Sequence, residues 1–112
     1  APAAPPPYLV KNLHPMNHQL IDDVENKRYY FDIDGVKPRI EYILVKDKIY
    51  LTHTEVPKSL AGKGIGSAIV KATLEDIDAR ELTLVPLCPF VAMYIKRYPE
   101  WRRLVLKGIN IE

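Results

Sequence analysis

Three of the five glycines of this chain, Gly62, Gly64 and Gly66, lie together in the sequence GKGIG. They follow a strand-like segment that stops at Pro57, and they precede apolar residues at helical spacing. Glycine tolerates positive φ and lets another group approach the backbone closely. The chain must therefore pass from a strand through a glycine-rich turn into a helix.

The segment before the turn predicts three strands. Residues 28 to 33 are rich in aromatic and β-branched side chains, Asp34-Gly35 is a strong hairpin signal, and residues 38 to 45 resume the alternation. Residues 48 to 56 form a third strand after a short polar turn. The first half is therefore expected to be an antiparallel meander.

The segment after the turn predicts helix, strand, helix and strand. An amphipathic helix runs to about Arg80, and a short buried strand follows in LTLVP. Cys88-Pro89 begins a second helix, because proline suits the first helical position, and Pro99 ends it. Residues 102 to 106 are expected to form the last strand. The fold class is α+β with a mainly antiparallel central sheet.

Length and composition fit one folded domain of 112 residues, with a net charge of only +2. That charge does not argue for nucleic acid, and no segment is long and apolar enough to suggest a membrane span. One cysteine cannot form an internal disulfide, and His14, His18 and His53 lack the spacing of a metal site. We expect no metal and a cytoplasmic location.

The N-terminus differs from the rest of the chain. Four of the ten prolines lie in residues 1 to 7, where they favour an extended conformation. We interpret residues 1 to 18 as a proline-rich extension and expect residues 1 to 15 to be processed or artificially added. Residues 19 to 112 then form the single domain.

A glycine turn at a helix start can bind an anion, because the first-turn amides lack partners and carry the positive end of the helix dipole. The alternative is that the glycines only permit a tight turn. Pro57 stands where the P-loop pattern needs its first glycine, and Ser67 where the dinucleotide fingerprint needs its last. Neither common nucleotide motif fits.

The segment HTEVPKSLAGKGIGSAIVKATLE resembles the acyl-coenzyme A site of the GNAT superfamily of N-acetyltransferases. LVPLCPFVAMYIKRYPEW resembles its small single-domain branch. The superfamily loop pattern falls on Ala61, Gly64 and Gly66, and Ala61 departs from the usual Arg or Gln. The resemblance implies a GNAT-like acyl-CoA N-acyltransferase fold.

The resemblance also implies where acetyl-CoA or coenzyme A binds. The pyrophosphate would meet the backbone amides of the loop, with Lys63 either compensating for the missing side chain at residue 61 or simply solvated. Pantetheine would bind the backbone near Glu55 and Val56, whose amide would polarise the thioester carbonyl. The expected cofactor-binding residues are Glu55, Val56, Gly62, Lys63, Gly64, Ile65, Gly66, Ser67, Cys88 and Pro89.

Three side chains are catalytic candidates. Cys88, at a helix start that favours a thiolate, is a pocket-lining residue, an acid, base or transient acyl acceptor, or a redox-sensitive thiol. Tyr94 either packs in the core or protonates the leaving thiolate. His53 shares one strand face with Glu55 and is either simply hydrogen-bonded or accepts the proton of the amine.

The sequence thus predicts an acyl-CoA-dependent N-acetyltransferase that transfers an acetyl group to an unidentified amine. The alternative is an acetyl-CoA or coenzyme A sensor or regulatory module without efficient turnover. A third class is an unrelated anion-binding protein. Cofactor binding separates the third class from the first two, and transfer to an amine separates the first from the second.

Overall fold

The computed structural model describes residues 18 to 111, and the proline-rich extension therefore lies outside the described residues apart from His18. Five strands form one sheet in the order β1-β2-β3-β4-β5. They are β1 (Ile21–Asp23), β2 (Arg28–Tyr30), β3 (Arg39–Val45), β4 (Lys48–Glu55) and β5 (Thr83–Pro86). Neighbours are antiparallel from β1 to β4, and only β4 and β5 are parallel.

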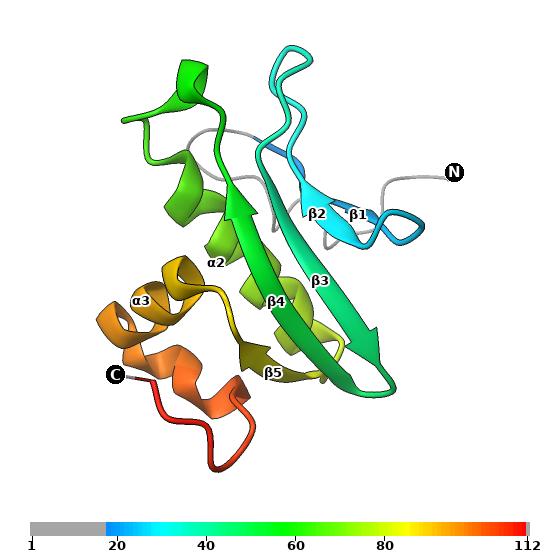
Figure 1. Cartoon of the computed structure of the whole chain (residues 1–112), viewed down its shortest axis with the longest axis vertical. Helices are drawn as coiled ribbons and strands as arrows, with labels where there is room; N and C mark the ends of the chain where they lie inside the picture. The colour runs from blue at the N-terminus through cyan, green and yellow to red at the C-terminus, as the bar shows by residue number, and fades with distance from the viewer. Residues whose placement is uncertain (1–17, 112) are drawn as a thin grey trace.

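The parallel pair is joined by a helix, as a crossover requires. A 3₁₀ turn, η1 (Lys58–Leu60), and the glycine loop lead from β4 into α2 (Ile65–Ala79). Figure 1 shows α2 behind β3 and β4, with α3 (Pro89–Arg97) beside it. One core lies between the sheet and the helices, and its largest fully buried side chains include Tyr29, Phe31, Ile40, Ile49, Leu51, Ile69, Leu74, Ile77, Leu84 and Ile95.

Most predicted elements are confirmed, and the differences lie in the meander and at the C-terminus. β1 was not predicted, because the turn that joins it to β2 lacks a glycine signal and uses Lys27 at a φ of 56°. The strand expected over residues 28 to 33 ends at Tyr30. The hairpin at Asp34-Gly35 is present, with φ of 53° and 86° and an isolated bridge between Ile33 and Val36.

The prediction of a strand over residues 102 to 106 is wrong. The chain instead forms a 3₁₀ helix, η2 (Pro99–Leu104), followed by one parallel bridge between Leu84 and Val105. Arg103 donates two hydrogen bonds of 2.8 and 2.6 Å to the Asp78 carboxylate of α2, and Leu104 is buried in the core. These tertiary contacts outweigh the strand preference of a run that lacks strict alternation.

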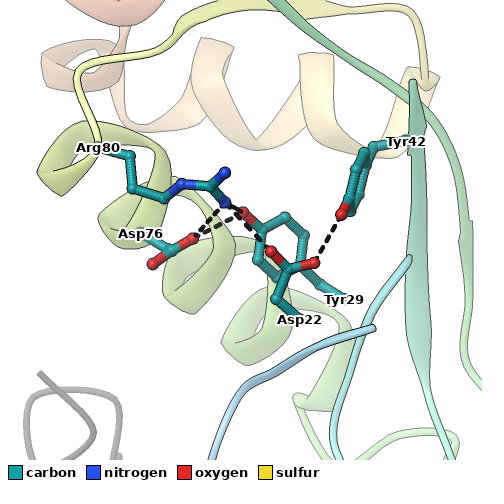
Figure 2. Close-up of polar contacts among 5 residues, drawn as sticks. All are labelled: Asp22, Tyr29, Tyr42, Asp76 and Arg80. Atoms are coloured by element: carbon teal, nitrogen blue, oxygen red, sulfur yellow. Dashed lines mark hydrogen bonds and ion pairs between the residues drawn. The ribbon is translucent and has the colours of Figure 1, made fainter. Parts of the chain in front are cut away.

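A polar cluster, which we call the tyrosine clamp, ties the meander to α2 (Figure 2). The Tyr29 hydroxyl donates to Asp76 Oδ2 at 2.6 Å, and the Tyr42 hydroxyl donates to Asp22 Oδ1 at 2.6 Å. Arg80 Nη1 donates to Asp22, Tyr29 and Asp76. Burial, followed by the bond to Asp76, raises the pKa of Tyr29, so its hydroxyl stays protonated and donates. The clamp therefore links β1, β2, β3 and the end of α2.

Removing the Tyr29 hydroxyl should destabilise the fold. Tyr29→Phe deletes a buried donor to a carboxylate, for which we expect a loss of about 1 to 3 kcal/mol in the free energy of unfolding. Tyr50→Phe is the matched control, because Tyr50 lies half-buried on β4 and its hydroxyl has no hydrogen bond among the described residues. Urea denaturation measures both. Equal losses in the two variants would contradict a stabilising clamp.

Candidate functional site

The glycine loop turns the chain from β4 into α2 with two residues in the left-handed region. Gly62 and Gly64 have φ of 77° and 73°, and Gly64 is the N-cap of α2. The Ala61 amide donates to Lys58 O, and the Ala68 amide donates to Gly64 O. Between them, the amides of residues 62 to 67 have no backbone acceptor in the described part of the chain. The loop therefore offers a run of free N–H donors.

The surroundings of these donors suit an anion. Gly64 has no side chain with which to cap the helix, and the first turn of α2 contains no acidic residue. The positive end of the helix dipole is thus left uncompensated. Lys63 is exposed within the loop, where it is free to meet an anion. The sequence-predicted loop residues are therefore brought together in a form that can bind a phosphate group.

Gly66 has a packing role that the sequence did not reveal. A Cβ at this position would lie 2.8 Å from Cζ of Phe90 in α3 and 3.6 Å from a methyl group of Val56. The absence of a side chain thus lets the starts of the two helices and the end of β4 meet. Phe90 is 40% exposed and lies over this junction.

The strands β4 and β5 part beside the loop. Their register joins Lys48–Leu51 of β4 to residues 83 to 86, and β4 then continues to Glu55 without β5. Pro86 has no N–H with which to extend the ladder. The Leu87 amide turns back to Val85 O, and the Cys88 amide makes the last link to β4, at Leu51 O (2.8 Å). The edge of β4 beyond Leu51 is therefore released from β5.

A β-bulge at Thr52 decides which way the side chains on this edge point. The register with β3 passes from Leu51 opposite Tyr42 to His53 opposite Glu41, which leaves Thr52 unpaired. A bulge adds a residue and so reverses the alternation of faces. Thr54 then lies opposite the buried Ile40 and faces the helices, whereas His53 faces outward.

Cys88 lies where the sequence placed it, at the N-cap of α3. It is buried, and its Sγ is 3.2 Å from Thr54 Oγ1. The thiol thus lies on the helix side of the sheet, next to the released edge of β4. Sequence reasoning missed Thr54, because only the bulge turns this residue toward Cys88.

Tyr94 lines a groove between α2 and α3 with a volume of about 70 Å³, together with Ser67, Phe90, Met93 and Arg97. Its ring packs against that of Tyr98, with centroids 4.7 Å apart. Burial, followed by the nearby Tyr98 and Glu100, raises the pKa of Tyr94 to about 12, so the hydroxyl is protonated at neutral pH. The Tyr94 hydroxyl therefore carries a proton at the edge of a groove whose lining includes Ser67 in the first turn of α2.

His53 is not brought to Cys88. Its Nε2 lies 3.0 Å from Glu55 Oε1, and both side chains are about half exposed on the outer face of the sheet. The sequence-based expectation that His53 and Glu55 share a face agrees with this geometry. The candidate residues thus form two groups: the loop, Cys88 and Tyr94 toward the helices, and the pair of His53 and Glu55 on the opposite face.

Residues 18 to 111 contain no group of three or more His, Cys, Asp or Glu side chains arranged to hold a metal ion. Within the same residues, no helix has the length and hydropathy needed to cross a membrane.

Comparison with known proteins agrees with this geometry. The family model described as GCN5-related N-acetyl-transferase matches residues 28–104, which is well over half of the chain. No curated protein matches the sequence. The chain belongs to the GCN5-related N-acetyltransferase family, and its fold and acetyltransferase type of activity follow from that membership.

The contact between Gly66 and Phe90 predicts a coupling between these residues. Alanine is favoured over glycine inside a helix by about 1 kcal/mol. Gly66→Ala should lose this gain in the wild-type background, because its Cβ pushes against the Phe90 ring. In a Phe90→Ala background the same substitution should stabilise the protein. A double-mutant cycle from urea denaturation should give a coupling of about 0.5 to 1 kcal/mol, and strictly additive effects would contradict the contact.

Proposed function

We propose that this protein is a cytoplasmic N-acetyltransferase that transfers an acetyl group from acetyl-CoA to an amine. The observation that carries the proposal is the junction of the free loop amides with the released edge of β4. Family membership supports acetyl transfer in general. A single free cysteine, Cys88, fits a reducing compartment.

The loop is the proposed site of the coenzyme A pyrophosphate. The amides of Gly62, Lys63, Gly64, Ile65, Gly66 and Ser67 are the donors, and the Lys63 ammonium adds charge. Several fixed donors around one anion need no cationic side chain at residue 61, where this chain has Ala. Arg97 and Ser67 line the same groove, so the Arg97 guanidinium is a further cationic group beside the proposed pyrophosphate site.

The pantetheine arm is proposed to run along the released edge of β4. Backbone groups of Glu55 and Val56 would bind it as a neighbouring strand would, and Cys88 and Pro89 would line the other side. The thioester would then lie near Val56, whose amide donates to the carbonyl oxygen. This donor matters because negative charge develops on that oxygen during attack.

The reaction needs a neutral amine and a proton for the thiolate. The amine nitrogen forms a bond to the thioester carbon, and the carbon–sulfur bond breaks. His53, paired with Glu55, or a water molecule takes the proton of the amine. Tyr94 donates its proton to the departing thiolate, and its raised pKa of about 12 keeps that proton in place at neutral pH.

Direct attack of the amine on the thioester is favoured over a route through an acylated Cys88. A covalent route needs a base that activates the thiol. The partner of Cys88 Sγ is the Thr54 hydroxyl, and His53 lies on the opposite face of the sheet. We therefore assign Cys88 to the lining of the pantetheine site.

The alternative function is an acetyl-CoA or coenzyme A sensor without efficient turnover. It is favoured by the open outer face of the sheet, because no described helix lies over β3 and β4 there. The exposed residues of β3 are the apolar Ile43, Leu44 and Val45, and those of β4 are His53 and Glu55. Transfer to an amine distinguishes the two functions, because a sensor binds the cofactor and does not consume it.

The proposed pyrophosphate site predicts that Gly64→Ala weakens coenzyme A binding. A methyl group at this left-handed position strains the loop and obstructs its donors, so we expect at least a tenfold loss, or about 1.4 kcal/mol. Gly35→Ala is the matched control, because Gly35 has a similar positive φ in a distant hairpin with open space around it. Calorimetry measures the affinity for coenzyme A. Thermal unfolding measures the backbone strain that alanine at a positive φ causes in both variants. Equal coenzyme A affinity in the two variants would exclude the loop.

The proposed proton donor predicts a contrast between Tyr94 and Cys88. Tyr94→Phe should lower kcat by about tenfold to a hundredfold without abolishing turnover, because a thiol with a pKa near ~8.5 also leaves with help from water. Cys88→Ala should keep most turnover. Tyr98→Phe, which preserves the ring contact with Tyr94, is the control. A collapse of kcat in Cys88→Ala, with an acetylated thiol detected after rapid quench of the wild type, would overturn direct attack.

A further inference from the structure

The outer face of the sheet contains a cavity of about 250 Å³ lined by charged and polar side chains. It lies over β1, β2 and β3, and its lining residues are Asp23, Asn26, Arg28, Tyr30, Lys37 and Arg39. Three of these side chains are cationic, and one is acidic. The Asp23 carboxylate already accepts hydrogen bonds from the amide and the side chain of Asn26. The cavity thus has an excess of positive charge.

The cationic side chains of this cavity retain unused hydrogen-bonding capacity. Arg28 Nε is buried and has no hydrogen-bond partner among the described residues. Lys37 Nζ lies 5.3 Å from the centre of the Tyr30 ring and has no carboxylate within ion-pair distance among the described residues. Arg39 uses its Nε on Glu41 at 2.8 Å. The guanidinium groups and the ammonium that line the cavity can form charge-assisted hydrogen bonds to an anion placed there.

The strand register leads from the cavity to the pair of His53 and Glu55 along the outer face. Cross-strand partners share a face, and the register runs from Arg28 to Glu41 to His53. The next row runs from Tyr30 to Arg39 to Glu55. Along these rows the outer face passes from Arg28 on β2, through the ion pair of Arg39 and Glu41 on β3, to an exposed carboxylate and imidazole on β4. That end lies at the released edge, where the thioester is proposed to bind.

We propose that this face binds the acceptor, and that the acceptor is a primary amine that also carries a carboxylate or phosphate group. The inference rests on the proposed acetyl transfer. The anion lies in the cavity of Arg28, Lys37 and Arg39, and the amine lies beside Glu55 and His53. Because neighbouring strands are about 4.8 Å apart, the two charges of the acceptor are separated by roughly 5 to 10 Å.

In this arrangement the anion end and the amine end of the acceptor site have different roles. Arg28, Lys37 and Arg39 position the acceptor and select against amines that lack an anion. Glu55 attracts the ammonium form, and His53 takes its proton before or during attack. Helices α2 and α3 lie on the other face, so the acceptor and the coenzyme approach the edge of β4 from opposite sides (Figure 1).

A set of matched amines tests the inference on the unmodified protein. The probes are γ-aminobutyrate, its neutral amide and butylamine, with aminoethyl phosphate as the second anion. We expect kcat/KM for γ-aminobutyrate to exceed that for the neutral amide by at least tenfold. Equal values, with measurable transfer, would overturn the anion site and leave acetyl transfer intact. Coenzyme A binding without transfer to any amine would instead contradict both proposals.

One substitution locates the selectivity. Lys37→Gln should raise KM for γ-aminobutyrate by about fivefold to tenfold, with unchanged KM for butylamine and unchanged affinity for coenzyme A. Lys107→Gln, which removes an equal charge from the exposed C-terminal segment, is the control. Equal changes in KM for both amines would overturn the assignment, because a structural defect affects both substrates.

Two kinds of molecule combine a primary amine with a nearby anion: a free zwitterionic amine, and a protein in which a lysine lies beside an acidic residue. A capped Lys-Glu dipeptide and a capped Lys-Gln dipeptide distinguish them from γ-aminobutyrate. Preferential acetylation of Lys-Glu identifies a protein lysine, whereas turnover of γ-aminobutyrate alone identifies a small molecule. Either preference supports the anion site. Equal turnover of the charged and neutral members, both in the dipeptide pair and in the pair of γ-aminobutyrate and its amide, would contradict the anion site.

Discussion

The hydrogen bonds that end the parallel pairing of β4 and β5 determine the rest of this site. Pro86 lacks the N–H that would continue the ladder, and the Cys88 amide makes the final link at Leu51 O. From this point α3 begins, while β4 continues to Glu55 paired with β3 and without β5. The free edge, the buried thiol and the groove of Tyr94 all arise from this one termination.

The open edge needs a rigid support, and the tyrosine clamp supplies it at the far side of the sheet. Tyr29 and Tyr42 extend from β2 and β3 toward Asp76 and Asp22, and Arg80 at the end of α2 joins both carboxylates (Figure 2). The clamp fixes the C-terminal end of α2 on the meander. The N-terminal end of the same helix is thereby held beside the edge of β4, where Gly66 packs under Phe90.

The sequence predicted the elements whose signals are local. The backbone preferences of glycine and proline predicted a turn at Asp34-Gly35 and helix starts at the glycine loop and at Cys88-Pro89. All three lie where they were expected. The bulge at Thr52 could not be predicted, because the register with β3 decides it. For the same reason Thr54 was missed beside Cys88. Residues 102 to 104 became part of a 3₁₀ helix through contacts with α2 that no local pattern encodes.

The central claim is that the freed edge of β4 and the uncapped start of α2 form one acyl-CoA site. A crystal structure with coenzyme A bound tests it most directly. The account predicts pyrophosphate oxygens within hydrogen-bond distance of the amides of residues 62 to 67, and pantetheine between β4 and the start of α3. Coenzyme A bound elsewhere, or strands β4 and β5 fully paired in the complex, would contradict it.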